Sequence, residues 1–391
     1  MRTLKEKLKK WNWFYTVQCE IRTLIQERKN SWAEAVIKNR EEHPEGFNLH
    51  DYKKALRRYR TTYHEYCTYE FWRLTEKERY NYLSEKELKC IYRKIIDGDT
   101  IKQLDNKLTE HLRFEKFMHR AWLCPILSTF TSFCQFVTTH DCIVKPYLGS
   151  LGQGVFMIRQ NEAVDLKELY DNCCQSHLIV EERVRAHADI EEFHPQSLNT
   201  IRIMSMSKGD KFGIISCEIR LGIGKNIVDN AATGGILAPI DPNTGLITDD
   251  GRDTNGHVYV THPDTGKVIK GFVIPYWDKV IAACKEMTTY APNAIFAGWD
   301  LCVLNNGEIE MIEVNSAAHI MGLQVSHGSG LRPRIQALGK EILGYDLTKL
   351  ISVWSRSHVN LFEKKQYNHS HKGDSDWLLQ EFISCSSSTI R

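Results

Sequence analysis

A lysine followed by three glycines is the first stretch of this sequence whose residues could do chemistry. Residues 142–158 read CIVKPYLGSLGQGVFMI, so Lys145 precedes Gly149, Gly152 and Gly154. A glycine-rich hairpin lets backbone N–H groups close over phosphate oxygens, because side chains at those positions would hold the chain away. The position of the lysine excludes a Walker A loop, and the order of the glycines excludes a dinucleotide fingerprint. Taken alone, the stretch fits a phosphate-binding hairpin and an ordinary long hairpin with a solvated lysine equally well.

A second stretch carries the oxygen ligands that a metal ion needs. Residues 298–319 read GWDLCVLNNGEIEMIEVNSAAH, with Asp300 on one predicted strand and with Glu313 and Asn315 on its hairpin partner. Alternate residues of a strand point to the same face, and pairing brings Asp300 opposite the other two. Two carboxylates and an amide oxygen suit Mg²⁺, whose remaining positions are filled by phosphates and water. The same alternation is typical of any half-exposed hairpin, but a carboxylate on so apolar a strand needs a partner because unpaired buried charge is costly.

Both stretches require strands to position them, and the sequence indicates where these lie. Apolar runs are separated by turn residues at 208–210 (Lys-Gly-Asp) and at 305–307 (Asn-Asn-Gly). Such residues tolerate the positive φ angles of tight turns, so two antiparallel hairpins are predicted. Between 101 and 178, short strand-like runs flank a helical stretch at 165–175, which predicts mixed helix and strand. A last helix is expected over 331–344.

The first hundred residues are rich in charged and aromatic side chains and predict several helices. Thr75 with Glu78, and Ser84 with Glu87, have the spacing of capping boxes. The aromatic run at 63–72 is typical of a core, with stacking on a sugar acceptor as the alternative. The expected α+β organisation is a helical N-terminal region (1–100), a first subdomain with the glycine-rich lid (101–178), a second subdomain with the metal site (179–355) and a polar tail (356–391).

The composition predicts a soluble globular protein of the cytoplasm. Lys and Arg number 51 against 49 Asp and Glu, so the net charge of +2 gives no reason to expect nucleic acid. The 12 cysteines include no C-x-x-C spacing, which indicates reduced thiols and no zinc knuckle. No apolar run reaches the roughly 18 residues of a transmembrane helix. The basic N-terminal stretch at 1–26 predicts packing on the protein's own body, with a peripheral membrane contact as the alternative.

Several short motifs together resemble the ATP-grasp superfamily. They are Lys145 before GSLGQG, the run LIVEE at 178–182, and Asp300 with Glu313-Val314-Asn315. More narrowly, NTIRI at 199–203, DNAATGGI at 229–236 and the expected helix LDNK at 104–107 are similar to the sugar-transfer-associated ATP-grasp branch, which is related to the α-L-glutamate ligase-like proteins. The resemblance covers about 65–345. It implies an α+β ATP-grasp fold, in which two subdomains hold ATP between them.

The resemblance also implies roles for individual residues. Lys107 and Lys145 would contact phosphates, the hinge at 181–184 would bind adenine with Glu181 near the base, and Asp189 would contact the ribose. Asn230, with Gly234 and Gly235, resembles the loop that lines the acceptor pocket in this family. The nucleotide and pocket contacts implied are Lys107, Lys145, Ser150, Gly152, Gly154, Glu181, Glu182, Val184, Asp189 and Asn230. The catalytic residues implied are Arg202 and Arg220, and the Mg²⁺ ligands implied are Asp300, Glu313 and Asn315.

Arginine suits the implied catalytic positions because its fork holds phosphate or carboxylate oxygens in a fixed orientation. A cross-strand ion pair at the surface is the alternative for Arg202 and for Arg220. The sequence shows no obvious general base, and His319, just after the metal strand, is a candidate.

The function implied is an ATP-dependent carboxylate–amine ligase with ATP and Mg²⁺ as cofactors. The γ-phosphoryl group passes to a small-molecule carboxylate, and an amine or sugar acceptor then displaces phosphate from the acylphosphate. The resemblance places this reaction in cell-surface polysaccharide biosynthesis. One alternative is a small-molecule or sugar kinase that uses the same site, and another is a nucleotide-binding scaffold with a degraded metal site.

Overall fold

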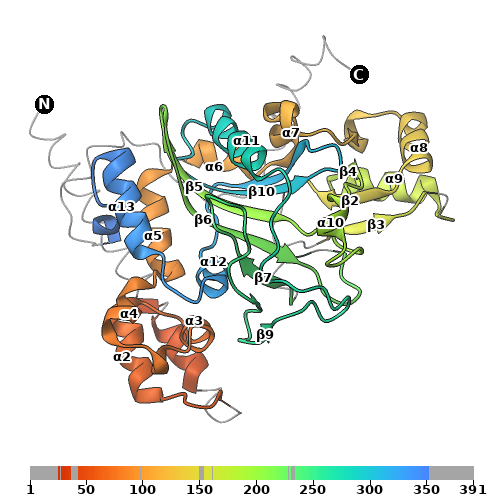
Figure 1. Cartoon of the computed structure of the whole chain (residues 1–391). Coiled ribbons are helices and arrows are strands. Elements are labelled where there is room, and N and C mark those ends of the chain that lie inside the picture. Colours follow the sequence, from red (N-terminus) through yellow and green to blue (C-terminus); the bar gives the residue numbers. More distant parts are fainter. Residues whose placement is uncertain are drawn as a thin grey trace, which may run out of the picture. The chain divides into compact units, whose positions relative to one another are not determined.

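The computed structural model of the chain describes residues 25–26, 28–36, 43–96, 98–148, 154–160, 162–227, 229 and 234–351. Figure 1 shows two sheets, with helices packed around them, and a group of helices from the N-terminal part of the sequence. Strands and helices alternate irregularly along the chain, so the α+β class expected from the sequence is confirmed. The basic N-terminal stretch at 1–24 and the expected tail lie outside the described residues.

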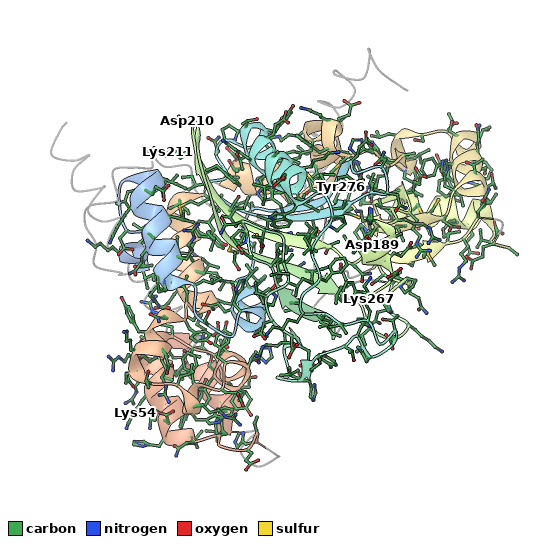
Figure 2. The ribbon with its side chains drawn as sticks, viewed as in Figure 1. Lys54, Asp189, Asp210, Lys211, Lys267 and Tyr276 are labelled. Carbon is green, nitrogen blue, oxygen red and sulfur yellow. The ribbon has the colours of Figure 1, made fainter. Side chains whose placement is uncertain are left out.

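The larger sheet is antiparallel, with the strand order β11-β10-β5-β6-β7-β8-β9. Both predicted hairpins are present: Gly209 and Gly307 have φ angles of +62° and +78° at their turns. Figure 2 labels Asp210 and Lys211 at the tip of the β5–β6 hairpin. The strands are β5 (Ile201–Lys208), β6 (Lys211–Leu221), β7 (Ile236–Pro239), β8 (Gly251–Arg252), β9 (Val258–Tyr259), β10 (Phe296–Val303) and β11 (Ile309–Asn315).

The two faces of the large sheet have different partners because strand residues alternate. Ile201 and Ile203 of β5 belong to the core under helix α11 (Trp277–Tyr290). Met204 and Met206 belong to the core formed with α5 (Glu85–Ile95) and α13 (Arg332–Leu338). Arg202 alternates with these methionines along β5 and points to the same face of the sheet. This second face therefore has polar side chains near Arg202 and core side chains near Met204 and Met206. The remaining elements here are α10 (Ala188–Glu191), α12 (Met321–Ser326), the turn η5 (Gly339–Leu343) that continues α13, and η6 (Leu347–Ile351).

The smaller sheet is also antiparallel, in the order β1-β4-β2-β3. Val144 on β2 pairs with Phe156 on β3, so the glycine-rich stretch joins two antiparallel strands, as predicted. Strand β4 pairs with β2, and the small sheet therefore ends at Glu182, beyond the boundary expected at 178. Helices α8 and α9 pack on this sheet through an apolar cluster. The elements are β1 (Trp122–Leu123), β2 (Cys142–Pro146), β3 (Phe156–Ile158), β4 (Leu178–Glu182), η3 (Pro125–Leu127), α8 (Phe130–Thr139) and α9 (Leu166–Gln175).

The segment LDNK, expected to be helical, is the junction between two helices. Helix α6 (Gly98–Leu104) ends where the motif begins, and α7 (Lys107–Arg113) starts with its last residue. The Asn106 side chain accepts hydrogen bonds from the Leu108 and Thr109 amides. Asparagine satisfies the free N–H groups at a helix start, which is why the helix breaks here. The short turn η2 (Glu115–Phe117) follows α7.

The N-terminal helices begin at the caps that the sequence predicted. Thr75 and Ser84 each form a capping box with the glutamate three residues later, and Thr62 forms a further one. The aromatic run at 63–72 is mainly core, because Tyr66 and Phe71 are 0% and 1% exposed. Every helix of the described ranges is too short or too polar to span a bilayer. The helices are α2 (Leu49–Tyr59), α3 (Tyr63–Thr68), η1 (Phe71–Arg73), α4 (Glu76–Asn81) and α5.

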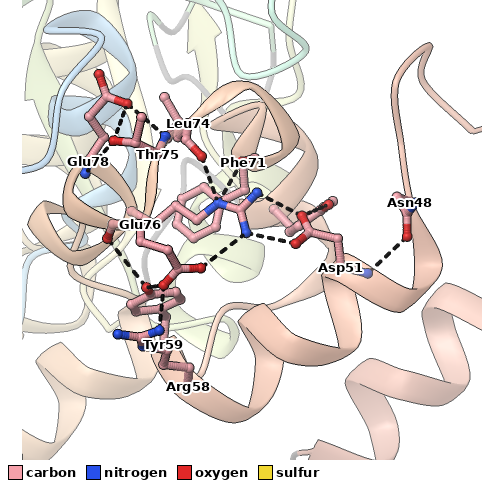
Figure 3. Close-up of polar contacts among 11 residues, drawn as sticks. Asn48, Asp51, Arg58, Tyr59, Phe71, Leu74, Thr75, Glu76 and Glu78 are labelled. Carbon is pink, nitrogen blue, oxygen red and sulfur yellow. Dashed lines mark hydrogen bonds and ion pairs between the residues drawn. The ribbon is translucent and has the colours of Figure 1, made fainter.

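A buried arginine ties these helices together. Arg79 of α4 donates from Nε to the carbonyl oxygens of Phe71 and Leu74, at 2.8 and 3.1 Å. Its two other nitrogens donate to Asp51 of α2 at 2.9 and 2.8 Å. Figure 3 shows Asp51, Phe71 and Leu74 converging on this guanidinium. The bidentate geometry fixes the relative orientation of Arg79 and Asp51. This contact therefore holds helix α4 against helix α2.

Candidate active site

A cavity of about 1030 Å³ is lined by side chains from both sheets. Pockets for small molecules and cofactors are typically about 300–1,000 Å³, so this one can hold a nucleotide together with a second ligand. Strands β2 and β4 contribute from the small sheet, and β5, β6, β10 and β11 from the large sheet. The predicted site residues that line the cavity are Lys107, Lys145, Glu181, Glu182, Val184, Arg202, Arg220, Asp300, Glu313 and Asn315.

Two predicted contacts, Gly154 and Asp189, are not in the cavity lining. Gly154 has a φ of +72°, which favours glycine, just before β3. Asp189 has a 60% exposed side chain on α10, 3.6 Å from His187 Nδ1. Figure 2 shows it near Lys267, whose ammonium group donates to the Asp189 carbonyl oxygen at 2.6 Å. The position of Asp189 therefore argues against the expected ribose contact. Ser150, Gly152 and Asn230 lie outside the described residues.

A row of charged side chains crosses the large sheet at the cavity. Asp300 on β10 pairs with Glu313 on β11 and with Arg202 on β5. Arg202 in turn pairs with Glu218 on β6. Directly paired residues of neighbouring strands point to the same face, and all four line the cavity. The predicted opposition of Asp300 and Glu313 across their hairpin is therefore confirmed.

Two arginines hold the carboxylate of Asp300. Arg202 donates from Nε to Oδ1 and from Nη2 to Oδ2, the latter at 2.6 Å, and Arg220 Nη1 lies 3.4 Å from Asp300. Burial alone would raise the pKa of Asp300, but the charges of the two arginines outweigh it and lower that pKa. Arg202 thus forms a cross-strand ion pair, as the alternative expected, but the pair is buried and faces the cavity rather than bulk solvent.

The residues at this position fit Mg²⁺ by their chemistry. Asp300, Glu313 and Asn315 offer the oxygen ligands that this ion prefers. Each carboxylate oxygen has two lone pairs, so Asp300 keeps acceptor capacity while it is bound to Arg202. In the described part of the chain, no three His, Cys, Asp or Glu side chains are grouped to hold a metal. The candidate site therefore depends on the Asn315 amide oxygen as its third ligand.

The two predicted lysines line the cavity from strand β2 and from the start of helix α7. Lys145 Nζ lies 2.8 Å from Glu181 Oε2, and burial lowers the pKa of Lys145. Lys107 Nζ lies 3.9 Å from Glu313 Oε1. The Lys107 amide donates to the Tyr147 carbonyl oxygen at 2.9 Å, which ties the start of α7 to the strand that carries Lys145. Both lysines are therefore held by backbone or carboxylate contacts within reach of the same space.

Arg120 is a central residue of the site that the sequence did not reveal. Its Nε lies 3.0 Å from Glu181 Oε2 on the small sheet, and its Nη1 contacts both Glu310 and the Met311 carbonyl oxygen on the large sheet. His111 Nε2 lies 2.7 Å from the other oxygen of Glu181. Burial alone would raise the pKa of Glu181, but Arg120 and Lys145 outweigh it and hold that pKa well below its ordinary value. No local motif marks Arg120, because its partners are 61 or more residues away.

The N-terminal helices form a wall of the cavity through His64 and Glu85. Glu85 Oε1 accepts from the Ile320 and Met321 amides at 2.8 and 2.9 Å. Its Oε2 lies 3.1 Å from His319 Nδ1, and this hydrogen bond raises the pKa of His319. His319 also lines the cavity, so its role as a general base stays a prediction.

Comparisons with known proteins show the family to which the chain belongs. The sequence profile of the sugar-transfer-associated ATP-grasp family matches residues 92–340, well over half of the chain. No curated protein matches the chain. Among solved structures, the chain is similar to the ADP complex of purK, N5-carboxyaminoimidazole ribonucleotide synthetase, with 12% identity, a TM-score of 0.37, and coverage of 56% of this chain and 46% of that one.

A second similar structure is the ATP-grasp ligase PsnB with its minimal precursor, Mg and ADP, at 13% identity and a TM-score of 0.38, covering 65% of this chain and 62% of that one. A third is N5-carboxyaminoimidazole ribonucleotide synthetase from Thermotoga maritima, at 10% identity and a TM-score of 0.33, covering 55% and 42%. The chain thus spans less than two thirds of the length of each of these proteins. The family assignment rests on the profile match rather than on these distant likenesses. The chain belongs to the sugar-transfer-associated ATP-grasp family.

Proposed function

We propose that this protein is an ATP-dependent carboxylate–amine ligase that acts through an acylphosphate. The supporting observation is a cavity whose lining combines oxygen ligands suited to Mg²⁺ with basic side chains from both sheets. Phosphoryl transfer requires positioning and neutralisation of charge more than covalent help from side chains. This combination of residues provides both.

The basic residues of the cavity have different roles, which follow from their positions. Lys145 holds the ATP phosphates from the small sheet, Lys107 holds them from the start of α7, and Arg202 holds them from the large sheet. Bound at the three oxygen ligands, Mg²⁺ would neutralise phosphate charge. Arg220 lies beside Asp300 with its planar fork facing the cavity. Because such a fork binds a carboxylate in a fixed orientation, Arg220 orients the acid that receives the phosphoryl group.

The wider setting is part of the same proposal. The family description supports a carbohydrate context, and we infer that the acceptor is a cell-surface polysaccharide or its precursor, modified in the cytoplasm. The two subdomains that hold ATP correspond in this proposal to the two sheets, with the boundary after Glu182. A small-molecule or sugar kinase with the same ATP site would give a different product.

Mass spectrometry distinguishes these activities. Purified protein is incubated with Mg-ATP, pooled amino acids and nucleotide sugars, and the products are scored for both kinds of mass shift. A condensed amide formed together with ADP and free phosphate is expected. A phosphorylated acceptor without condensation would replace the ligase with a kinase, and ADP formation independent of every acceptor would contradict both.

Lys145→Ala is expected to weaken Mg-ATP binding at least about tenfold, or about 1.4 kcal/mol. The reason is that the variant removes a buried cation from the phosphate side of the cavity. Isothermal calorimetry measures the affinity. Lys167→Ala on α9, where the lysine is 64% exposed and paired with Asp171, is the matched control and should bind normally. Unchanged affinity in Lys145→Ala would limit Lys145 to a structural role as the partner of Glu181.

A further inference from the structure

Glu218 is a buried carboxylate in the cavity to which no role has yet been given. Its side chain, on β6, is 1% exposed and lines the cavity. Its Oε1 lies 3.4 Å from Arg220 Nε, whereas no described residue donates a hydrogen bond to its Oε2. A buried carboxylate oxygen that accepts no hydrogen bond is costly in free energy. We therefore expect a hydrogen-bond donor for Glu218 Oε2.

Besides Arg220, two basic neighbours of Glu218 are committed to other groups. Arg202, its cross-strand neighbour, donates from Nε and Nη2 to Asp300. Burial lowers the pKa of His327, which disfavours its charged form, and its Nε2 lies 2.8 Å from Ser216 Oγ. The donor for Glu218 Oε2 is therefore expected to come from a bound molecule.

There is room for such a molecule beside the carboxylate. Gly322 on α12 lines the same cavity. A Cβ atom at this position would lie 3.4 Å from Glu218 Oε1 and 3.8 Å from Oε2, and 3.2 Å from Leu237 Cδ1. The glycine thus leaves a gap of about one methyl group next to the carboxylate.

Glu218 lies next to the candidate metal site but is separate from it. Arg220 contacts Glu218 through Nε and Asp300 through Nη1, both at 3.4 Å. Arg202 stands between Asp300 and Glu218 in the row across the sheet. The guanidinium group of Arg202, bound to Asp300, therefore belongs to the strand between the two carboxylates, and Glu218 is treated as separate from the candidate metal ligands.

We propose that Glu218 binds the acceptor as a primary ammonium ion and takes its proton during amide formation. The positive charge and N–H groups of an ammonium ion match what Glu218 Oε2 lacks. One proton passes to Glu218, and the lone pair of the neutral amine forms the C–N bond to the acylphosphate carbonyl carbon. The C–O bond to phosphate breaks, its electron pair leaves with phosphate, and the second nitrogen proton goes to that phosphate. This inference rests on the proposed ligase function.

Hydroxylamine tests the ligase proposal separately from the role of Glu218. It is neutral at neutral pH and attacks an acylphosphate without first losing a proton, so its reaction does not need Glu218 as a base. The unaltered protein, Glu218→Gln and Glu218→Asp are incubated with Mg-ATP and pooled amino acids, with or without hydroxylamine. Hydroxamates and amides are quantified by mass spectrometry. Asp210→Asn, at the tip of the same hairpin, is the carboxylate-to-amide control and should behave normally.

Glu218→Gln is expected to form hydroxamate at a near-normal rate while amide formation falls at least about 100-fold, with partial recovery in Glu218→Asp. Retention of both products, or equal loss of both with normal ATP binding, would overturn the role of Glu218 and leave the ligase proposal standing. If Glu218→Gln fails to bind ATP, Gly322→Ala decides: selective loss of amide supports the proposal, and normal amide formation overturns it. Absence of both products in the unaltered protein would overturn the ligase function, and this inference with it.

Discussion

Glu313→Ala is expected to lower ADP formation at least about 100-fold while the protein remains folded. Glu313 lines the cavity opposite Asp300, and its side chain is 30% exposed, so its loss removes a candidate metal ligand together with one long contact, at 3.9 Å from Lys107 Nζ. Asp300→Ala should lose the same activity but also stability. Its removal leaves the buried guanidinium of Arg202 without its bidentate partner, and breaking such a pair costs about 3–5 kcal/mol.

The contrast between the two variants tests the assignment more strictly than either alone. ADP release measures turnover, and urea denaturation measures the free energy of unfolding. Glu308→Ala is the control on the same hairpin, because its side chain is 53% exposed and lies outside the cavity lining. Full ADP formation by Glu313→Ala would refute the metal site. Equal stability of the two variants would instead show that Asp300 is not needed to hold Arg202.

The β10–β11 hairpin could be predicted from the sequence because local signals determine it. The turn Asn305-Asn306-Gly307 joins the two strands, and Gly307 adopts the positive φ that such a turn requires. The loop then sets the strand register, and the register places Asp300 opposite Glu313. The start of α5 was predictable for the same reason, since its capping box lies within four residues of sequence.

Contacts between distant segments could not be predicted in this way. Glu218 lies in an apolar run, and its exposure to the cavity depends on how β6 pairs with β5 and on the placement of Gly322 more than 100 residues later. The wall formed by Glu85 depends on contacts with Ile320 and Met321, 235 and 236 residues away. The segment LDNK shows an error of another kind. A family motif predicted one helix there, whereas α6 ends at Leu104 and Asn106 caps the start of a second helix, α7.

Arg120→Met is expected to lower the free energy of unfolding by about 3–5 kcal/mol, because it leaves a buried carboxylate without its counter-charge. Arg120 contacts Glu181 and Glu310, whose side chains are 5% and 1% exposed. Once Arg120 is removed, the two carboxylates differ in the hydrogen-bond partners that they keep. Glu181 keeps Lys145 and His111, whereas Glu310 keeps only the His119 amide among the hydrogen bonds recorded for the described residues. Most of the loss should therefore arise at Glu310.

A double variant tests this division. Replacing both members of a buried ion pair with apolar residues is far less costly than removing one, so Arg120→Met with Glu310→Met should recover much of the stability lost by Arg120→Met. Urea denaturation measures all three proteins, and Lys116→Met, which breaks an exposed pair with Glu286, is the control with no expected change. Failure of the double variant to recover would place the cost at Glu181. In that case Arg120 would act mainly on the carboxylate that pairs with Lys145, and the same variant should weaken Mg-ATP binding as Lys145→Ala does.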